Sequence, residues 1–589
     1  MTHAQRNEAV FYAFLAAICL LMTMKFFPGL ENELAYAGNA FQTIYPDAFA
    51  GDIYHGPELP LSSKPLQLST LYLFTWLVGE PWLNDFYLAG FYLLIVAISL
   101  IGVDRIARHF GLENIYERAL VLMFFAKDHQ ILTGKVLVAH HQDVNHSALA
   151  IPIIVWLTYF ALARKHFFIL IVMSVLLVAT SPRNAFFPVV FAMMIKLVNG
   201  TDTERKIAAG LAVMGAGLLY AFLFHVYPIP ETDRLAMWDI LKAVEGDDAN
   251  AFRPDSLGPM WIRHAAWLAI VGAAIYAAAR LERASPELRT FFACGLFVWA
   301  AHGLYIEHAP DMIKMPLLLS LVPARSLSVI QNVAYIVLLS AALMHLRQNR
   351  DLRTIAGTLA LFAFLYAAGP GNRLLWLGVV AAAIALSWAA VALFAGRRKE
   401  SAAAHALALV VLPFLIATGV NYANAARSNW ADWQSAWRHG VYGATASAKW
   451  IGIAEYLRYE TPPGSSVLSF ECARPDNGCT RLKARRGLAV RSGRAMPTPD
   501  VVSAGFTHAQ VWEDMYRLLD RYDAIGKDLP AGDVEPLVQI LPTLKPVPDY
   551  LVLPAALDVI DTLEKNPAFE RVRTFPTYTV FAIKKDALP

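Results

Sequence analysis

Apolar runs of about twenty residues recur along this chain from Val10 to Tyr422, and short clusters of Lys and Arg separate them. A helix needs a run of this length to cross the hydrocarbon core of a bilayer. The sequence is 57% hydrophobic and 16% charged, whereas soluble domains carry roughly 25% charged residues. One water-soluble core cannot hold this surplus of apolar side chains. The sequence therefore predicts a polytopic α-helical membrane protein.

The charge pattern excludes a nucleic-acid partner. The net charge is +3, and the basic residues form separated clusters instead of one contiguous basic face. The first apolar run, Val10–Phe27, is followed by Pro28–Glu33 and not by a small-residue cleavage site. We therefore expect a retained first span and not a signal peptide.

The basic clusters also predict an orientation, because Lys and Arg gather on the cytoplasmic side of membrane proteins. With a cytoplasmic N-terminus, about thirteen spans of normal length place almost every basic cluster inside. This assignment requires Leu66–Val78 to be an interfacial helix and not a span. It predicts that the C-terminal region lies outside.

We expect two domains. Residues 1–424 form the membrane module, with a first outer loop at 29–85 that contains the interfacial helix, a second outer loop at 139–146 and a long one at 228–261. Residues 425–589 contain no run long enough to span, and they predict a small outer α/β domain. Helices are expected at 444–459, 508–522 and 556–565, and strands at 465–470, 550–553 and in a C-terminal hairpin. We expect this domain to shape or pack against a site, because it has neither a Gly-rich phosphate loop nor a nucleophile elbow.

Two of the four cysteines lie in a polar segment. Cys472 and Cys479 flank residues 473–478, which include Pro475 and Gly478. A small disulfide loop is plausible there if the segment lies in an oxidising compartment. Cys19 and Cys294 lie within apolar runs, where cysteine is usually a buried hydrophobic residue.

Acids of the first outer loop are candidates for catalysis. Glu31 and Glu33 directly follow the first span, and Asp52 lies further along the loop. A carboxylate at the membrane surface can act as a general base or hold a cation. The alternative is ordinary interfacial charge.

The second outer segment combines acids and imidazoles. Asp128 lies towards the outer half of the third span, and His141, Asp143 and His146 follow in the sequence HHQDVNH. These side chains suit a divalent metal such as Mg²⁺ or Mn²⁺. The alternative is a solvated loop whose histidines have no special role.

Two arginines are expected at the outer interface. Arg183 lies in SPRNAFFP, and Arg325 lies in PARSLS just before the tenth span. A guanidinium there can bind a lipid-linked phosphate through two parallel hydrogen bonds. The alternative is a long side chain that only reaches back to the interface.

The layout resembles the GT-C superfamily of membrane glycosyltransferases, which includes oligosaccharyltransferase subunits, protein mannosyltransferases and aminoarabinose transferases. The likeness comprises the acids after the first span, the acidic second outer loop, an Arg before a late span and an outer α/β domain. The segments KWIGIAEYLRYETPPGSSVLSF and FPTYTVFAIKK are also similar to the ends of bacterial members. The resemblance implies a bacterial inner (plasma) membrane protein with a cytoplasmic N-terminus and a periplasmic or extracellular C-terminal domain.

The resemblance further implies transfer of a sugar from a polyprenyl-phosphate-linked donor to a glycan, lipid or protein acceptor. Glu31, Glu33, Asp128 and Asp143 would be catalytic. Arg325, Arg183, Asp52 and His141 would bind substrate, and Asp143, His146 and Glu31 would hold a metal. The sequence departs from the family in two places: it has E-x-E instead of paired aspartates, and Asn429–Trp437 lacks the Trp-Trp-Asp order of oligosaccharyltransferases.

Two other functions remain open at this point. A transporter or flippase of a lipid-linked glycan would require ionisable residues along a transmembrane path, whereas here they cluster on one side. A catalytically inactive scaffold of the same fold is the second alternative.

Overall fold

The computed structural model describes most of the helices and the end of the chain. The described residues are 3–23, 85–126, 146–164, 167–221, 257–280, 285–312, 323–349, 352–367, 402–439, 444–472, 479–480 and 532–589 except 545 and 556, together with Leu488, Ser492, Arg494, Ile525 and Leu529. The chain divides into two compact units, and the helix α17 (Ala402–His439) belongs to the first of them as far as Asn429.

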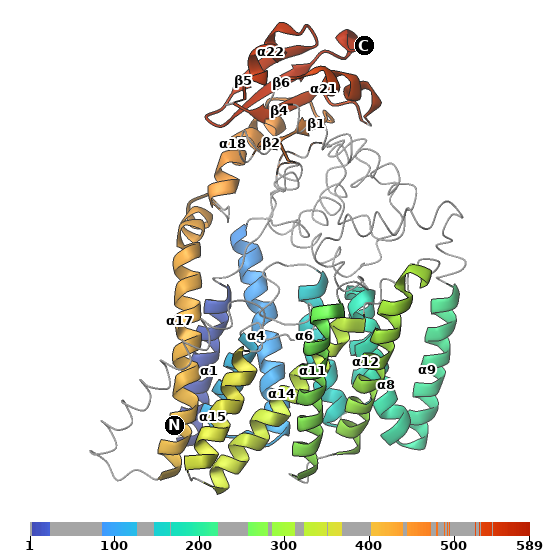
Figure 1. Cartoon of the computed structure of the whole chain (residues 1–589), viewed down its shortest axis with the longest axis vertical. Coiled ribbons are helices and arrows are strands. Elements are labelled where there is room, and N and C mark those ends of the chain that lie inside the picture. Colours follow the sequence, from blue (N-terminus) through green and yellow to red (C-terminus); the bar gives the residue numbers. More distant parts are fainter. Residues whose placement is uncertain are drawn as a thin grey trace, which may run out of the picture. The chain divides into compact units, whose positions relative to one another are not determined.

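The first unit is a bundle of helices (Figure 1). Its described helices are α1 (His3–Thr23), α4 (Asp85–His109), α5 (Ile115–Ala126), α6 (His146–Leu162), α7 (Phe167–Thr180), α8 (Pro182–Asn199), α9 (Asp202–Ala221), α11 (Leu257–Arg280), α12 (Pro286–Met312), α14 (Pro323–Gln348), α15 (Leu352–Ala367) and α17 (Ala402–His439). Helices satisfy their backbone hydrogen bonds internally, and lipid demands this of any spanning segment.

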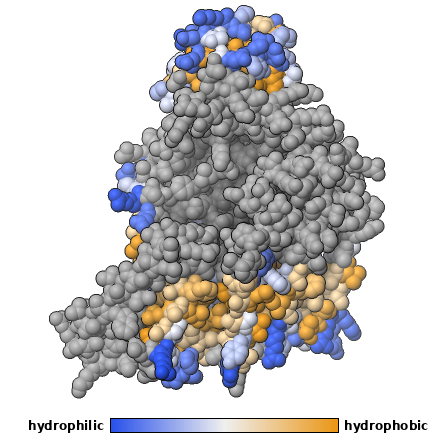
Figure 2. All heavy atoms as spheres, viewed as in Figure 1, coloured by the Kyte–Doolittle hydropathy of each residue, from blue (hydrophilic) through white to orange (hydrophobic). Residues whose placement is uncertain are grey.

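Large apolar side chains point outward from this bundle. Phe168, Val213 and Phe297 are 73%, 74% and 74% exposed. On the face shown in Figure 2, apolar residues form a band across the bundle, with hydrophilic residues along its lower border. Water would disfavour so much exposed apolar surface, whereas lipid tails would solvate it. The bundle therefore has the surface of a membrane-embedded fold.

The predicted number of spans is not established. Among the described residues, Gly90–His109 and Ser326–Gln348 are long and apolar enough to cross a membrane by length and composition alone. Seven shorter apolar helical stretches accompany them. The predicted interfacial helix at Leu66–Val78 and the span expected between Arg373 and Arg397 lie outside the described residues.

Three helices are longer than expected. α17 was expected to end near Tyr422, but it continues to His439 and carries Asn429–Trp437 as helix. α14 begins at Pro323, so Arg325 lies inside its first turn and not before it. α12 continues to Met312 and includes the polar residues of Glu307–Asp311, where we expect the ninth span to have ended. Hydropathy marks where apolar sequence ends, and a helix can continue beyond that point into water.

The second unit contains a four-stranded sheet of order β1-β4-β6-β5. β1 (Val467–Ser469) is parallel to β4 (Tyr550–Pro554), and β6 (Tyr578–Ile583) is antiparallel to both β4 and β5 (Phe569–Thr574). A separate hairpin pairs β2 (Glu471–Cys472) with β3 (Cys479–Thr480). The expected C-terminal hairpin and the strands near 465–470 and 550–553 are confirmed.

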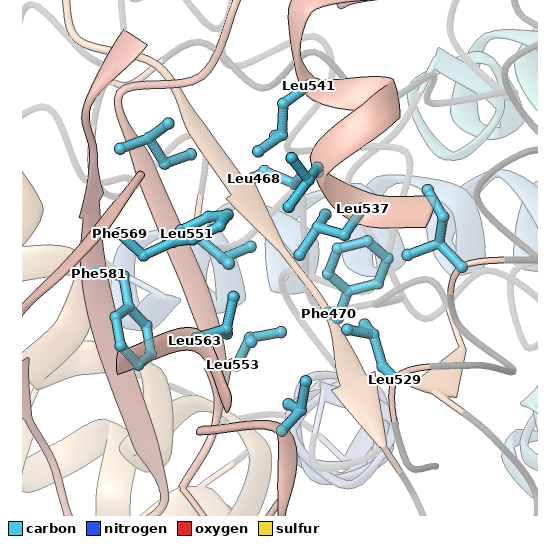
Figure 3. Packing of buried hydrophobic residues seen from close by; sticks show 14 of the residues in the cluster. Leu468, Phe470, Leu529, Leu537, Leu541, Leu551, Leu553, Leu563, Phe569 and Phe581 are labelled. Carbon is cyan, nitrogen blue, oxygen red and sulfur yellow. The ribbon is translucent and has the colours of Figure 1, made fainter. Parts of the chain in front are cut away.

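Helices and the sheet enclose an apolar core in this unit (Figure 3). The described helices are α18 (Ala444–Tyr459), α21 (Glu535–Ile540) and α22 (Val559–Lys565). Leu537 and Leu541 pack with Leu468 of β1 and Leu551 of β4. The predicted helices at 444–459 and 556–565 correspond to α18 and α22, whereas the one at 508–522 lies outside the described residues.

Candidate functional site

One end of the bundle carries a network of paired charges. Arg118 of α5 donates to both carboxylate oxygens of Asp104 at 2.6 and 3.0 Å and to Glu8 at 2.8 Å. Arg108 binds the same two acids, so the network joins α1, α4 and α5. The guanidinium carbon of Arg118 also lies 3.7 Å from the ring centroid of Phe11. Every charge in this network has a partner of opposite sign, which indicates a structural role.

Further ion pairs of the bundle also join helix ends. They are Arg347 with Glu117, Arg164 with Glu287, and Lys196 with Glu204. Together with the Glu8 network they define the ionic end of the bundle (Figures 1 and 2). The sequence predicted this end to be cytoplasmic. The structure adds that its acids and bases hold neighbouring helices together.

Three helices begin at the opposite end of the bundle. α6, α8 and α14 each reach the ionic end at or near their last residues, through Arg164, Lys196 and Arg347. Their first turns contain His146, Arg183 and Arg325, in that order. α8 packs against both α6 and α14. The structure therefore places the backbones of three predicted site residues at one end of one helix cluster.

The first turn of α8 is suited to an anion. Its N-cap, Ser181, forms no capping hydrogen bond with its side chain, and Pro182 follows it. Ser181 is buried, and its hydroxyl accepts a hydrogen bond from Asn184 at 3.0 Å. Pro182 has no N–H group, and those of Asn184 and Ala185 donate to the Ser181 carbonyl. Positive charge at this end therefore comes from the helix dipole and from the full charge of Arg183 and not from free N–H groups.

The first half of α14 contains buried polar residues. Ser326, Ser328 and Gln331 are 4%, 2% and 1% exposed, and Gln331 donates to the Tyr335 hydroxyl at 3.1 Å. The side-chain oxygen of Asn332 is buried and has no hydrogen-bond partner within the described part of the chain. Polar groups within an apolar bundle are costly to bury, so this run of them marks the first half of α14 as a candidate functional segment.

The polar character extends to α11 and α12. Trp299 of α12 donates to Nδ1 of His264 at 3.0 Å, and Trp267 of α11 donates to the Leu327 carbonyl of α14 at 3.2 Å. Our sequence analysis did not single out His264, Gln331 or Asn332. A polar residue within an apolar run is the signal that identifies each of them.

The remaining predicted site residues cannot be placed. Glu31, Glu33, Asp52, Asp128, His141 and Asp143 lie outside the described residues. The same is true of the side chains of His146, Arg183 and Arg325. Within the described ranges, no three His, Cys, Asp or Glu residues lie close enough to hold a metal ion. The catalytic and metal assignments therefore stay predictions.

The second unit contains a buried cation that the sequence analysis did not consider. Arg494 is 5% exposed and donates to the carbonyls of Leu457, Arg458 and Thr461 at 2.9 Å each. These carbonyls lie at the end of α18, where the helix dipole favours a cation. Burial lowers the pKa of Arg494. The geometry indicates a helix cap and not a substrate-binding group.

No model of a known protein family matches this chain, and no curated protein matches it significantly. Among solved structures, the chain is similar to apo ArnT from Cupriavidus metallidurans, with 13% identity, a TM-score of 0.46 and full coverage of both chains. ArnT from this organism bound to undecaprenyl phosphate gives 13% identity, a TM-score of 0.40, and coverage of 99% and 98%. The archaeal oligosaccharyltransferase AglB from Archaeoglobus fulgidus, in complex with an inhibitory peptide and a dolichol-phosphate, gives 11% identity, a TM-score of 0.37, and coverage of 99% of this chain and 75% of AglB.

Proposed function

We propose that this chain is a membrane glycosyltransferase that transfers a sugar from a polyprenyl-phosphate-linked donor to an acceptor at the outer face of the membrane. The observation that carries the proposal is the position of Arg183 and Arg325. Both lie in the first turns of packed helices, at the end of the bundle opposite the paired charges. A phosphate on a lipid tail needs such a place, where cationic groups meet an apolar belt.

The proposed reaction assigns each group a task. The oxygen or nitrogen of the acceptor attacks the anomeric carbon of the sugar, and Glu31 or Glu33 accepts the proton that this atom loses. The bond from that carbon to the phosphate oxygen breaks, and the polyprenyl phosphate leaves with the bonding electrons. Arg325, assisted by Arg183, neutralises the charge that grows on the leaving phosphate. Asp128 is a further candidate for catalysis, and Asp52 and His141 would contact the sugar.

A divalent cation is part of the proposal. Asp143, His146 and Glu31 would hold Mg²⁺ or Mn²⁺, whose charge would stabilise the phosphate. Purified protein is expected to lose transfer after dialysis against EDTA and to regain it when Mg²⁺ or Mn²⁺ is added. Full activity in EDTA, with metal analysis confirming removal, would refute the cation while leaving the transferase proposal intact.

The proposal is tested with purified protein in liposomes and a panel of polyprenyl-phosphate donors carrying radiolabelled sugars. Glu31→Gln, Glu33→Gln and Arg325→Ala are each compared with Arg353→Ala, which removes an exposed basic side chain near the start of α15. We expect the control to keep wild-type transfer and at least one glutamate variant to lose 100-fold or more, on the order of what a general base contributes.

The same liposomes separate the alternatives. Movement of the labelled lipid across the bilayer without transfer of its sugar would identify a flippase. Binding of the lipid with neither movement nor transfer, for every donor and acceptor offered, would identify a scaffold. If Glu31→Gln, Glu33→Gln and Arg325→Ala all retain wild-type transfer, the transferase activity is supported but these residues are not its site.

A further inference from the structure

The hairpin formed by β2 and β3 brings two cysteines together. β2 is antiparallel to β3, and its register pairs Glu471 with Thr480 and Cys472 with Cys479. β2 follows β1 almost directly, and it contacts β4. The two cysteines are therefore direct cross-strand partners at the base of residues 473–478.

This register meets the backbone requirement for a disulfide. Directly opposite residues of an antiparallel pair have Cα atoms about 4.5–5.5 Å apart, and their side chains leave the same face of the ladder. A disulfide requires a Cα separation of about 4.4–6.8 Å. A shift of one residue in the register would place the two side chains on opposite faces.

The other two cysteines belong to different surroundings. Cys19 is 3% exposed in α1, and Cys294 is half-buried in α12. Both are helical residues of the first unit, whereas the hairpin belongs to the second. Cys472 and Cys479 are thus matched to each other by position.

We propose that Cys472 and Cys479 form an intramolecular disulfide that closes residues 473–478 into a covalent loop. One thiolate attacks a disulfide oxidant of the outer compartment, and the second thiol then displaces the resulting mixed disulfide. The two thiols lose two electrons and two protons, and the oxidant is reduced to a dithiol. The bond links β2 to β3 covalently, and β2 contacts β4. Its formation rests on the outer location that the proposed function also requires.

Differential alkylation of the full-length protein tests the bond. Membranes are treated with N-ethylmaleimide in denaturant, then reduced, and then treated with iodoacetamide. Trypsin does not cleave between Arg474 and Pro475, so both cysteines stay in the peptide Tyr459–Arg481. We expect this peptide to carry two iodoacetamide labels and no maleimide label. In Cys472→Ser, Cys479 is expected to carry maleimide, whereas Cys294→Ser leaves the wild-type pattern unchanged.

Three results would overturn the disulfide: maleimide on both cysteines of the wild type, a disulfide-linked dimer that Cys472→Ser abolishes, or release of both thiols by a chelator alone. A separate measurement tests the location. A membrane-impermeant maleimide should label Cys479 of Cys472→Ser in intact cells. If Cys479 is labelled only after permeabilisation, the outer location that the proposed function requires is contradicted. This result does not depend on whether the disulfide forms.

Discussion

Arg118 illustrates how a charged side chain is accommodated inside this bundle. Its side chain is 2% exposed, and that of its partner Asp104 is 6% exposed. Two hydrogen bonds to Asp104 and one to Glu8 engage all three nitrogens of the guanidinium. The pair gains little net stability against an apolar alternative, but the loss of Arg118 leaves two acids with Arg108 as their common partner.

We therefore expect Arg118→Ala to destabilise the bundle strongly. Removing one partner of a buried ion pair costs about 3–5 kcal/mol when the other charge is left unpaired. Arg108 still binds Asp104 in this variant, so we expect a loss near the lower end of that range. Arg353→Ala, which removes an exposed cation, should change stability by less than about 0.5 kcal/mol. Thermal unfolding in detergent, followed by circular dichroism, compares the two. The double variant Arg118→Met with Asp104→Leu should recover part of the loss, and no recovery would show that the charges act independently.

Arg325 is predicted to act through phosphate binding. Replacing it by Ala removes a charge-assisted pair worth about 1.5–3 kcal/mol, so the affinity for a polyprenyl phosphate should fall by about 10- to 150-fold. Arg325→Lys keeps the charge but not the planar fork, and we expect an intermediate affinity. Binding of the phosphate in detergent, measured by native mass spectrometry, distinguishes these cases. Equal affinity of the wild type and both variants would show that Arg325 does not bind the phosphate.

At the scale of elements, the sequence predicts best where local signals agree. α18 occupies the predicted residues 444–459, because its amphipathic pattern is followed directly by Thr461-Pro462-Pro463-Gly464. The extension of α17 to His439 was missed, because the residues after Tyr422 are polar but keep good helix formers such as Ala and Arg. Hydropathy indicates whether a helix is surrounded by lipid or by water, but it does not indicate where the helix ends.

Helix packing provides a sharper test of the arrangement. A Cβ added to Gly295 of α12 would lie 2.8, 2.9 and 3.0 Å from the side-chain carbons of Ile330 in α14. Gly295→Ala should therefore destabilise by about 1–3 kcal/mol through overpacking. Gly272→Ala in α11 is the matched control, since a Cβ there meets nothing within 4 Å. Equal thermal stability of the two variants would contradict the packing of α12 against α14; Ile330→Val should partly rescue Gly295→Ala.

At the scale of the whole molecule, the sequence indicated which charges gather but not which of them pair. Arg118 reaches Glu8 across 110 positions, and Arg347 reaches Glu117 across 230. Such partners depend on how distant helices align, and a single sequence contains no record of that alignment. The predicted site has the same limitation: Arg183 and Arg325 were found individually, whereas the packing of α8 against α14 relates them.

The last prediction concerns the orientation of the chain in the membrane. Thr203, near the start of α9, and Asp586, near the C-terminus, are both exposed, and neither is used in the site or in an ion pair given above. In a background without the four native cysteines, Asp586→Cys should react with an impermeant maleimide on intact cells. Thr203→Cys should react only after the membrane is opened, because α9 begins at the ionic end, beside Lys196 and Glu204. We expect this result because Lys and Arg gather in the cytoplasmic loops of membrane proteins, and the opposite orientation would place the basic clusters outside. The reverse pattern would place Arg183 and Arg325 on the cytoplasmic side and would contradict sugar transfer at the outer face. If both cysteines react on intact cells, the number of spans between Thr203 and Asp586 is even and not odd as predicted.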